Sequence, residues 1–155
     1  MAMVLEWTLR DWRKMVIPNC SLPLLIGVGL LTACDGILGL GEDKRVGVIE
    51  HYGDPVVITV PDSVQAGVSF EVSVLTYGGG CLSKDGTEVQ VSGLSADVTP
   101  YDIHSGAKVC TDDLGLFDHR AMVTLRESGV AEIRFHGKQM PEDSLITVVR
   151  EVVVE

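Results

Sequence analysis

The feature that most constrains this chain is a two-residue alternation of apolar and polar side chains, which recurs from residue 55 onward. In residues 68–74, the side chains of Phe70, Val72 and Val74 lie on one face of an extended strand, and serines and a glutamate lie on the other. The same part of the chain shows no convincing period of 3.6 residues, which a helix would require. The alternation therefore predicts an all-β domain whose sheets are buried on one face and solvated on the other.

Further short runs of this kind follow one another, separated by turns rich in glycine, proline, aspartate and serine. Strands of this length and spacing are typical of an antiparallel sandwich or barrel. The predicted strands cover residues 56–60, 68–74, 88–92, 120–126, 131–136 and 145–154.

Two segments resemble parts of bacterial immunoglobulin-like (Ig-like) modules. Residues 61–67 (PDSVQAG) resemble the passage from the first strand to the second, and residues 123–135 resemble the last hairpin before the closing strand. The resemblance covers residues 56–155 and implies an Ig-like antiparallel β-sandwich of seven strands. Both tryptophans, Trp7 and Trp12, lie far upstream, so the core tryptophan of antibody domains is missing.

The closing strand, residues 145–154, departs from the alternation because it is apolar on both faces. One face carries Leu145, Val149 and Val153, and the other carries Ile146, Val148, Val152 and Val154. Three explanations are open: a central strand that is covered on both sides, a β-bulge near Arg150 that exchanges the faces, or an exposed patch that docks a partner.

The chain begins with the features of a bacterial secretory signal, which are basic residues, an apolar stretch and then small residues. Residues 15–33 hold no charge, and three basic residues precede them. Residues 31–34 (LTAC) resemble the lipobox of bacterial lipoprotein precursors. The resemblance implies that Cys34 receives a diacylglyceryl thioether and that signal peptidase II cuts after Ala33.

An uncleaved transmembrane helix is the alternative, because residues 17–40 carry a single charge and about 20 apolar residues cross a bilayer. Both interpretations place the β domain in the bacterial cell envelope, on the periplasmic or external side of a membrane. The predicted parts are a signal peptide or anchor helix (1–33), a flexible tether (34–54) and the Ig-like domain (55–155). Residues 46–52 of the tether are an alternative first edge strand.

The charge balance argues against nucleic acid as a partner. The chain has 12 Lys and Arg against 22 Asp and Glu, a formal net charge of −10, which repels phosphate backbones. The expected partners are membrane lipid, reached through Cys34 or the N-terminal helix, and a membrane protein complex.

Cys81 and Cys110 are the two cysteines of the predicted domain, and in an exported chain they are expected to form a disulfide. Closing a loop of about 30 residues would stabilise the fold by about 3.5 kcal/mol. This bridge should lie nearer a loop end than the inter-sheet bridge of Ig domains. His104, His119 and His136 show no ligand spacing with the cysteines, so no metal or other cofactor is expected.

No catalytic set emerges from the sequence. Residues 93–97 (GLSAD) lack the closing glycine of a nucleophile elbow, and residues 39–41 lack the further glycine of a phosphate loop. A loop containing Asp112, Asp113 and His119 is the sole support for a small hydrolase.

The sequence therefore favours a non-enzymatic envelope lipoprotein whose Ig-like domain binds or scaffolds. The alternative is an accessory structural subunit of an inner-membrane complex that keeps its N-terminal transmembrane helix. The two differ in whether residues 1–33 remain on the protein.

Overall fold

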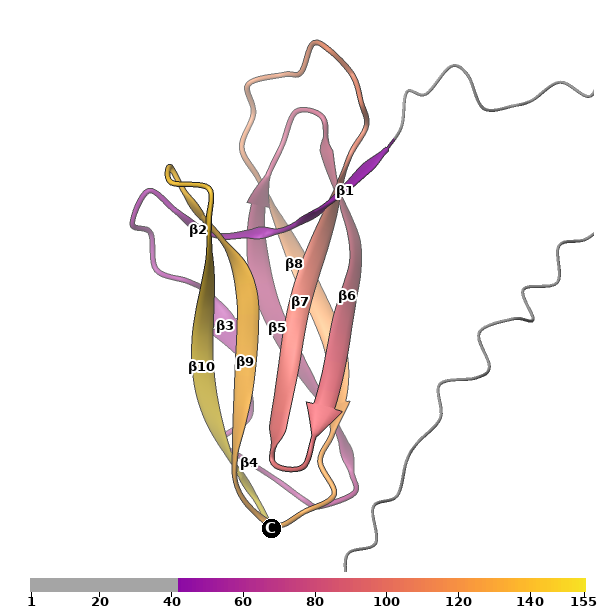
Figure 1. The fold of residues 1–155 in the computed structure, drawn as a ribbon, viewed down its shortest axis with the longest axis vertical. Coiled ribbons are helices and arrows are strands. Elements are labelled where there is room, and N and C mark those ends of the chain that lie inside the picture. The colour runs from indigo at the N-terminus through magenta and orange to yellow at the C-terminus, as the bar shows by residue number, and fades with distance from the viewer. Residues whose placement is uncertain (1–41) are drawn as a thin grey trace, which may run out of the picture. The chain divides into compact units, whose positions relative to one another are not determined.

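The computed structural model describes residues 42–155, which form ten β-strands and no helix (Figure 1). The predicted all-β class is confirmed for this part of the chain. The strands are β1 (Asp43–Val46), β2 (Val48–His51), β3 (Ile58–Thr59), β4 (Ser63–Val64), β5 (Ser69–Gly78), β6 (Leu82–Ser92), β7 (Ser95–His104), β8 (Gly115–Thr124), β9 (Gly129–Met140) and β10 (Ser144–Val154).

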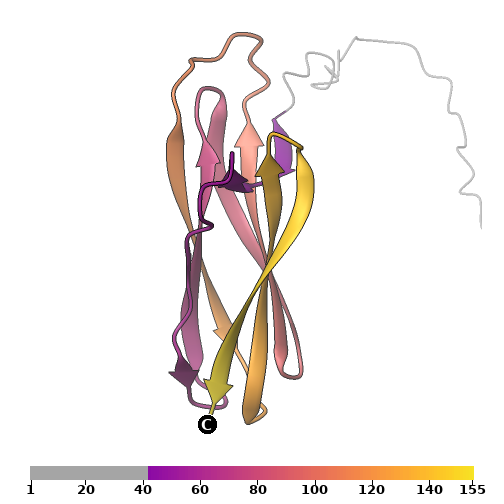
Figure 2. The same ribbon diagram turned by 90° about the vertical axis from the view of Figure 1, so that its left-hand side faces the viewer.

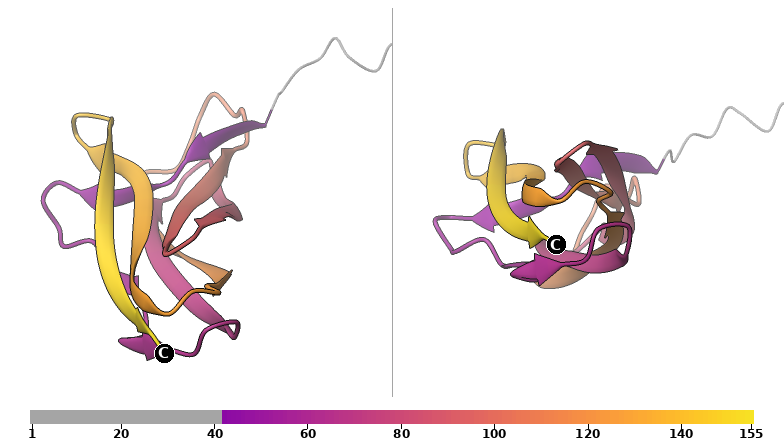
Figure 3. Two further views of the ribbon diagram at one scale, coloured as in Figure 1. Left: turned by 60° about the horizontal axis from the view of Figure 1, so that its bottom comes forward. Right: turned by 90° about the horizontal axis from the view of Figure 1, so that it is seen from below.

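The strands belong to one sheet that curls until two groups of strands face each other (Figures 2 and 3). One group contains β3, β5 and β8, and the other contains β6, β7, β9, β10 and β4. β2 joins the groups, because it pairs with β9 on one side and with β5 on the other. The result is a sandwich-like fold around a single core.

The core is built from the inward side chains of both groups. On β9 the alternating residues Ala131, Ile133 and Phe135 are fully buried. They lie among inward residues from the neighbouring strands: Ile49, Val72, Val74, Ala96, Val98, Val123, Leu125, Val152 and Val154. Removing one such large apolar side chain from water stabilises the fold by about 1.5–3 kcal/mol, so the alternation seen in the sequence is the main source of stability.

Residues 43–51 differ from the tether expected over residues 34–54. They form β1, which pairs with β7, and β2, which is not an edge strand but lies between β9 and β5. Ile49 is completely buried, and burial of this side chain draws the segment into the domain. The domain therefore begins before residue 55, and the alternative of a strand within residues 46–52 is the nearer description.

The closing strand β10 alternates without a bulge. Its register with β9 is unbroken from Ser144 opposite Gln139 to Val154 opposite Gly129, so the bulge explanation is wrong. The other side of β10 pairs only at its last two residues, with β4. On the outer face of β10, the side chains of Leu145, Val149 and Val153 are exposed.

Three other strands differ from expectation. The strand predicted over residues 56–60 is reduced to β3, and neither β4 nor β7 was predicted. The predicted signal or anchor segment, the lipobox and Cys34 lie outside the described residues. Within residues 42–155, no helix is long and apolar enough to cross a membrane.

Candidate functional site

The candidate site lies at one end of the curled sheet, where two connections meet. Cys81 directly precedes β6, and Cys110 lies in the β7–β8 loop (residues 105–114). Gly80, with a φ of +62°, turns the chain into the site. A Cβ on Gly80 would lie 2.5 Å from the Thr111 carbonyl oxygen and 3.0 Å from the Cys110 Cβ. A glycine is therefore needed for the two connections to approach this closely.

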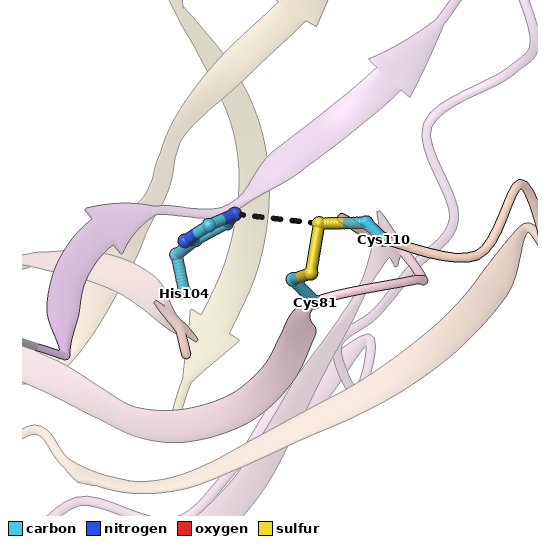
Figure 4. Close-up of side chains that lie close together, drawn as sticks. All are labelled: Cys81, His104 and Cys110. Carbon is cyan, nitrogen blue, oxygen red and sulfur yellow. Dashed lines mark hydrogen bonds between the residues drawn. A yellow bond between two sulfur atoms is a disulfide. The ribbon is translucent and has the colours of Figure 1, made fainter. Parts of the chain in front are cut away.

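The predicted pairing of Cys81 with Cys110 is confirmed by a disulfide between them, with a Cα–Cα distance of 5.2 Å (Figure 4). The bridge ties the β5–β6 turn to the β7–β8 loop rather than joining two buried strands. This position agrees with the expectation of a bridge near a loop end.

The imidazole ring of His104 lies beside the disulfide, as Figure 4 shows. The backbone N–H of Gly106 donates a hydrogen bond to His104 Nδ1, with a nitrogen–nitrogen distance of 3.0 Å. A nitrogen that accepts a hydrogen bond carries no proton, so the neutral ring holds its proton on Nε2. That nitrogen lies 3.9 Å from Cys110 Sγ, and its N–H donates towards the sulfur.

Asp113 anchors the β7–β8 loop beside the disulfide. Its carboxylate accepts hydrogen bonds from the Thr111 hydroxyl and from the backbone N–H of Gly80, the latter at 3.2 Å. These two hydrogen bonds, that of Thr111 first, hold the pKa of Asp113 below its ordinary value. Since Gly80 precedes Cys81 and Thr111 follows Cys110, the carboxylate is hydrogen-bonded to a neighbour of each cysteine.

The two sulfurs and the imidazole resemble a metal-binding triad in composition, because their ligand atoms all lie within 4.8 Å of one another. They do not fit a metal as arranged here. Both sulfurs are bonded to each other, and a metal requires thiolates. The imidazole nitrogen that faces them carries the proton that a metal would replace.

The predicted acidic loop around Asp112, Asp113 and His119 does not assemble as a site. His119 lies on β8 and is buried, with Nε2 at 3.0 Å from the buried Asp102 Oδ1. Its Nδ1 lies 3.3 Å from the Thr87 hydroxyl oxygen. A hydroxyl, imidazole and carboxylate in series occur in hydrolases, but here the imidazole and the carboxylate are closed off from a substrate. The series instead satisfies polar groups inside the sheet.

A cleft of about 530 Å³ adjoins Asp102, where β1 leads into β2. Its charged lining is largely paired, since Arg45 binds Asp43 at 2.8 Å and Lys138 binds Asp143 at 2.8 Å. The remaining carboxylate of the lining, Asp102, is buried and hydrogen-bonded to His119, so the described residues of the cleft present no unpaired charge to a ligand.

His104 was not connected with the cysteines at the level of sequence. It stands six residues before Cys110, a spacing that has meaning only once β7 is known to end at His104.

No family model matches the chain, and no curated protein or solved structure matches it at a significant level.

Proposed function

We propose that this protein is an exported, membrane-tethered β domain of the bacterial cell envelope, which binds a partner and catalyses no reaction at the binding surface. Export and tethering rest on the apolar leader and on residues 31–34, which resemble a lipobox. The Cys81–Cys110 disulfide supports an oxidising compartment, since disulfides are rare in reducing ones.

The observation that carries the binding proposal is an apolar strip on the outer face of β9 and β10, here called the hairpin patch. It consists of Leu145, Val149 and Val153 on β10 and Val130 on β9, which are 70%, 45%, 48% and 60% exposed. Val153 and Val130 are directly opposite each other in the ladder. Thr147 and Glu151 separate the three β10 residues on this face, so Val130 and Val153 form its one directly opposed apolar pair. Exposed apolar residues on one face of a hairpin are a feature of interaction surfaces.

The strand pairing supports an Ig-like domain in three places. β3 pairs with β5, β5 with β8, and β9 with β10, as strands A and B, B and E, and F and G do in Ig domains. Three parallel pairings, of β7 with β9, β2 with β9 and β4 with β10, depart from the predicted antiparallel sandwich. We infer an Ig-like sandwich in which the β6–β7 hairpin is arranged differently.

The tethering part predicts that Cys34→Ala abolishes incorporation of a labelled fatty acid, whereas Cys20→Ala, in the same leader, retains it. Intact-mass analysis of the native protein should find residues 1–33 removed and a lipid on Cys34. Equal labelling in Cys34→Ala would contradict the lipoprotein proposal. A native mass that includes residues 1–33 would favour the alternative, a complex subunit that keeps its helix.

The binding part predicts that Val149→Thr combined with Val153→Thr weakens recovery of cross-linked envelope partners several-fold and leaves the fold intact. Threonine keeps the β-branched shape but makes the patch polar. Val91→Thr is the matched control, because Val91 lies on β6 and is 45% exposed, as Val149 is. Unchanged recovery from the double variant would remove the hairpin patch from the proposal.

A further inference from the structure

The two cysteines of the disulfide differ in exposure. Cys110 is exposed in the β7–β8 loop, whereas Cys81, at the start of β6, is half-buried. An external thiolate exchanges with a disulfide by reaching one of its sulfurs directly, so access selects the sulfur that reacts. Access therefore selects Cys110 as the sulfur attacked and Cys81 as the sulfur that leaves.

The two sulfurs also differ in their polar surroundings. The Nε2–H of His104 is directed at Cys110 Sγ, and the Gly106 N–H fixes that proton position (Figure 4). A donor that faces a sulfur favours its charged form, so a thiolate on Cys110 is stabilised once the bridge opens. Disulfides whose reduced form is stabilised in this way are the more oxidising ones.

We propose that the Cys81–Cys110 disulfide is a site of thiol–disulfide exchange, in which Cys110 is the reacting sulfur and His104 is the positioning residue that stabilises its thiolate. The co-reactant is an exposed thiol, either of a small molecule or of a protein. This activity goes beyond the proposed binding function and does not depend on the hairpin patch or on the anchor.

The exchange proceeds in two displacements. The thiolate of the co-reactant bonds to Cys110 Sγ, the Cys81–Cys110 bond breaks, and its electron pair leaves on Cys81 Sγ, which takes a proton from water. A second thiolate then attacks the co-reactant's sulfur in the mixed disulfide, and Cys110 leaves as a thiolate beside the His104 Nε2–H. Two thiols are thereby oxidised to a disulfide, and Cys81 and Cys110 are reduced.

Among the described residues, the N–H donor found beside a sulfur is His104 Nε2, whereas the other polar neighbours of the two sulfurs are the carbonyl oxygens of Ala107 and Val109. On β1, Asp43 is opposite His104 in the ladder, but its carboxylate binds Arg45. The β7–β8 loop contributes Lys108, Asp112 and Asp113, and the last of these is hydrogen-bonded to Thr111 and Gly80. On β6, the Lys84 ammonium donates to the Asp118 carbonyl rather than to a sulfur.

The first test measures the reactivity of each cysteine in the full-length reduced protein. Brief alkylation with iodoacetamide between pH 5 and pH 9, followed by peptide mass spectrometry, separates Cys110 and Cys81 from the two cysteines of the leader. Near pH 6.5, Cys110 should react about tenfold faster than Cys81. This ratio corresponds to a Cys110 thiol whose pKa is lower than that of Cys81 by about one unit. His104→Leu should remove most of this advantage and move the pH profile of Cys110 upward.

Two further variants separate stabilisation of the thiolate from a general effect on the fold. His104→Gln keeps an N–H donor and should retain part of the advantage. His136→Gln alters a half-buried histidine on β9 that is hydrogen-bonded to Thr147 and Asp97 rather than to a cysteine, and it should leave the pH profile of Cys110 unchanged. In glutathione buffers, the ratio of [GSH]² to [GSSG] at half reduction should rise up to tenfold in His104→Leu.

A second test needs no variant, so it does not depend on whether the substitutions fold. Oxidised protein mixed with reduced glutathione and quenched with acid should carry the mixed disulfide on Cys110. Mixed disulfide mainly on Cys81, or equal alkylation of both cysteines with no effect of His104→Leu, would leave the bridge a structural one and overturn the proposal. Binding of one Zn²⁺ by the reduced protein, with protection of both cysteines, would overturn it in favour of a metal site.

Discussion

Gly137 on β9 controls how closely β2 approaches the core. A Cβ at this position would lie 2.6 Å from both Ile49 Cγ1 and Ile49 Cγ2, and 2.8 Å from Ile49 Cδ1. Ile49 is fully buried and cannot move aside without displacing other core residues. We expect Gly137→Ala to lower the free energy of unfolding by about 1–3 kcal/mol, measured by urea denaturation, because it overpacks the core.

The matched control for this prediction is Gly86→Ala on β6, where a Cβ would meet no atom within 4 Å. It should change stability by less than about 0.5 kcal/mol, as surface substitutions usually do. Combining Gly137→Ala with Ile49→Ala removes all three atoms that the new Cβ would meet, so the two effects should not add. Additive losses would show that the contact between Gly137 and Ile49 is not the cause.

The β7–β8 loop is the element whose attachment depends on pH. The pKa of Asp113 is lowered from its ordinary 3.8, first by the Thr111 hydroxyl and then by the Gly80 N–H. A lowered pKa in the folded state contributes stability above the unfolded value, and this contribution is lost as the pH falls through the folded value. We therefore expect the Gly80 amide resonance to shift with the Asp113 carboxyl in an NMR titration, with a midpoint below pH 3.8.

Asp113→Asn should reproduce the acid state at neutral pH, with faster amide hydrogen exchange at Gly80. Asp112→Asn changes the adjacent carboxylate, which does not accept the Gly80 hydrogen bond, and serves as the control. Equal exchange at Gly80 in Asp113→Asn and the unchanged protein would remove Asp113 from the attachment of the loop.

β7 shows why one strand escaped prediction. Its inward positions are Ala96, Val98, Pro100 and Asp102, so an imino acid and a carboxylate interrupt the apolar series. Each is accommodated by a distant segment: Asp102 binds His119, and the register of β6 shifts beside Pro100, which has no N–H to donate. Neither partner can be read from the local sequence of the strand.

β10 shows the opposite case, in which the pattern predicted more than one structure. Its two apolar faces were compatible with a bulge, a covered strand or an exposed patch. The structure decides between them, because Val152 and Val154 are buried whereas Val149 and Val153, on the opposite face, are exposed. Which face is covered depends on the packing of the whole domain and cannot be read from the composition of the strand.

At the scale of the whole molecule, the all-β class could be predicted because alternation is a local property of the chain. The disulfide could be predicted from the count of cysteines left after the leader. The position of His104 beside it could not, since that proximity requires both the end of β7 and the path of the β7–β8 loop. The curl of the sheet could not be predicted either, because it depends on the pairings of β2 with strands far along the chain.

The placement of β2 has a consequence for the order in which the domain folds. Val48 pairs with Tyr77 of β5 on one side and with Lys138 of β9 on the other, and the second of these pairings spans most of the domain. Pairings over such long separations make folding slow, because a large loop must close before the contacts that reward it can form. The contacts between β2 and β9 should therefore form late, after the local β6–β7 and β9–β10 hairpins.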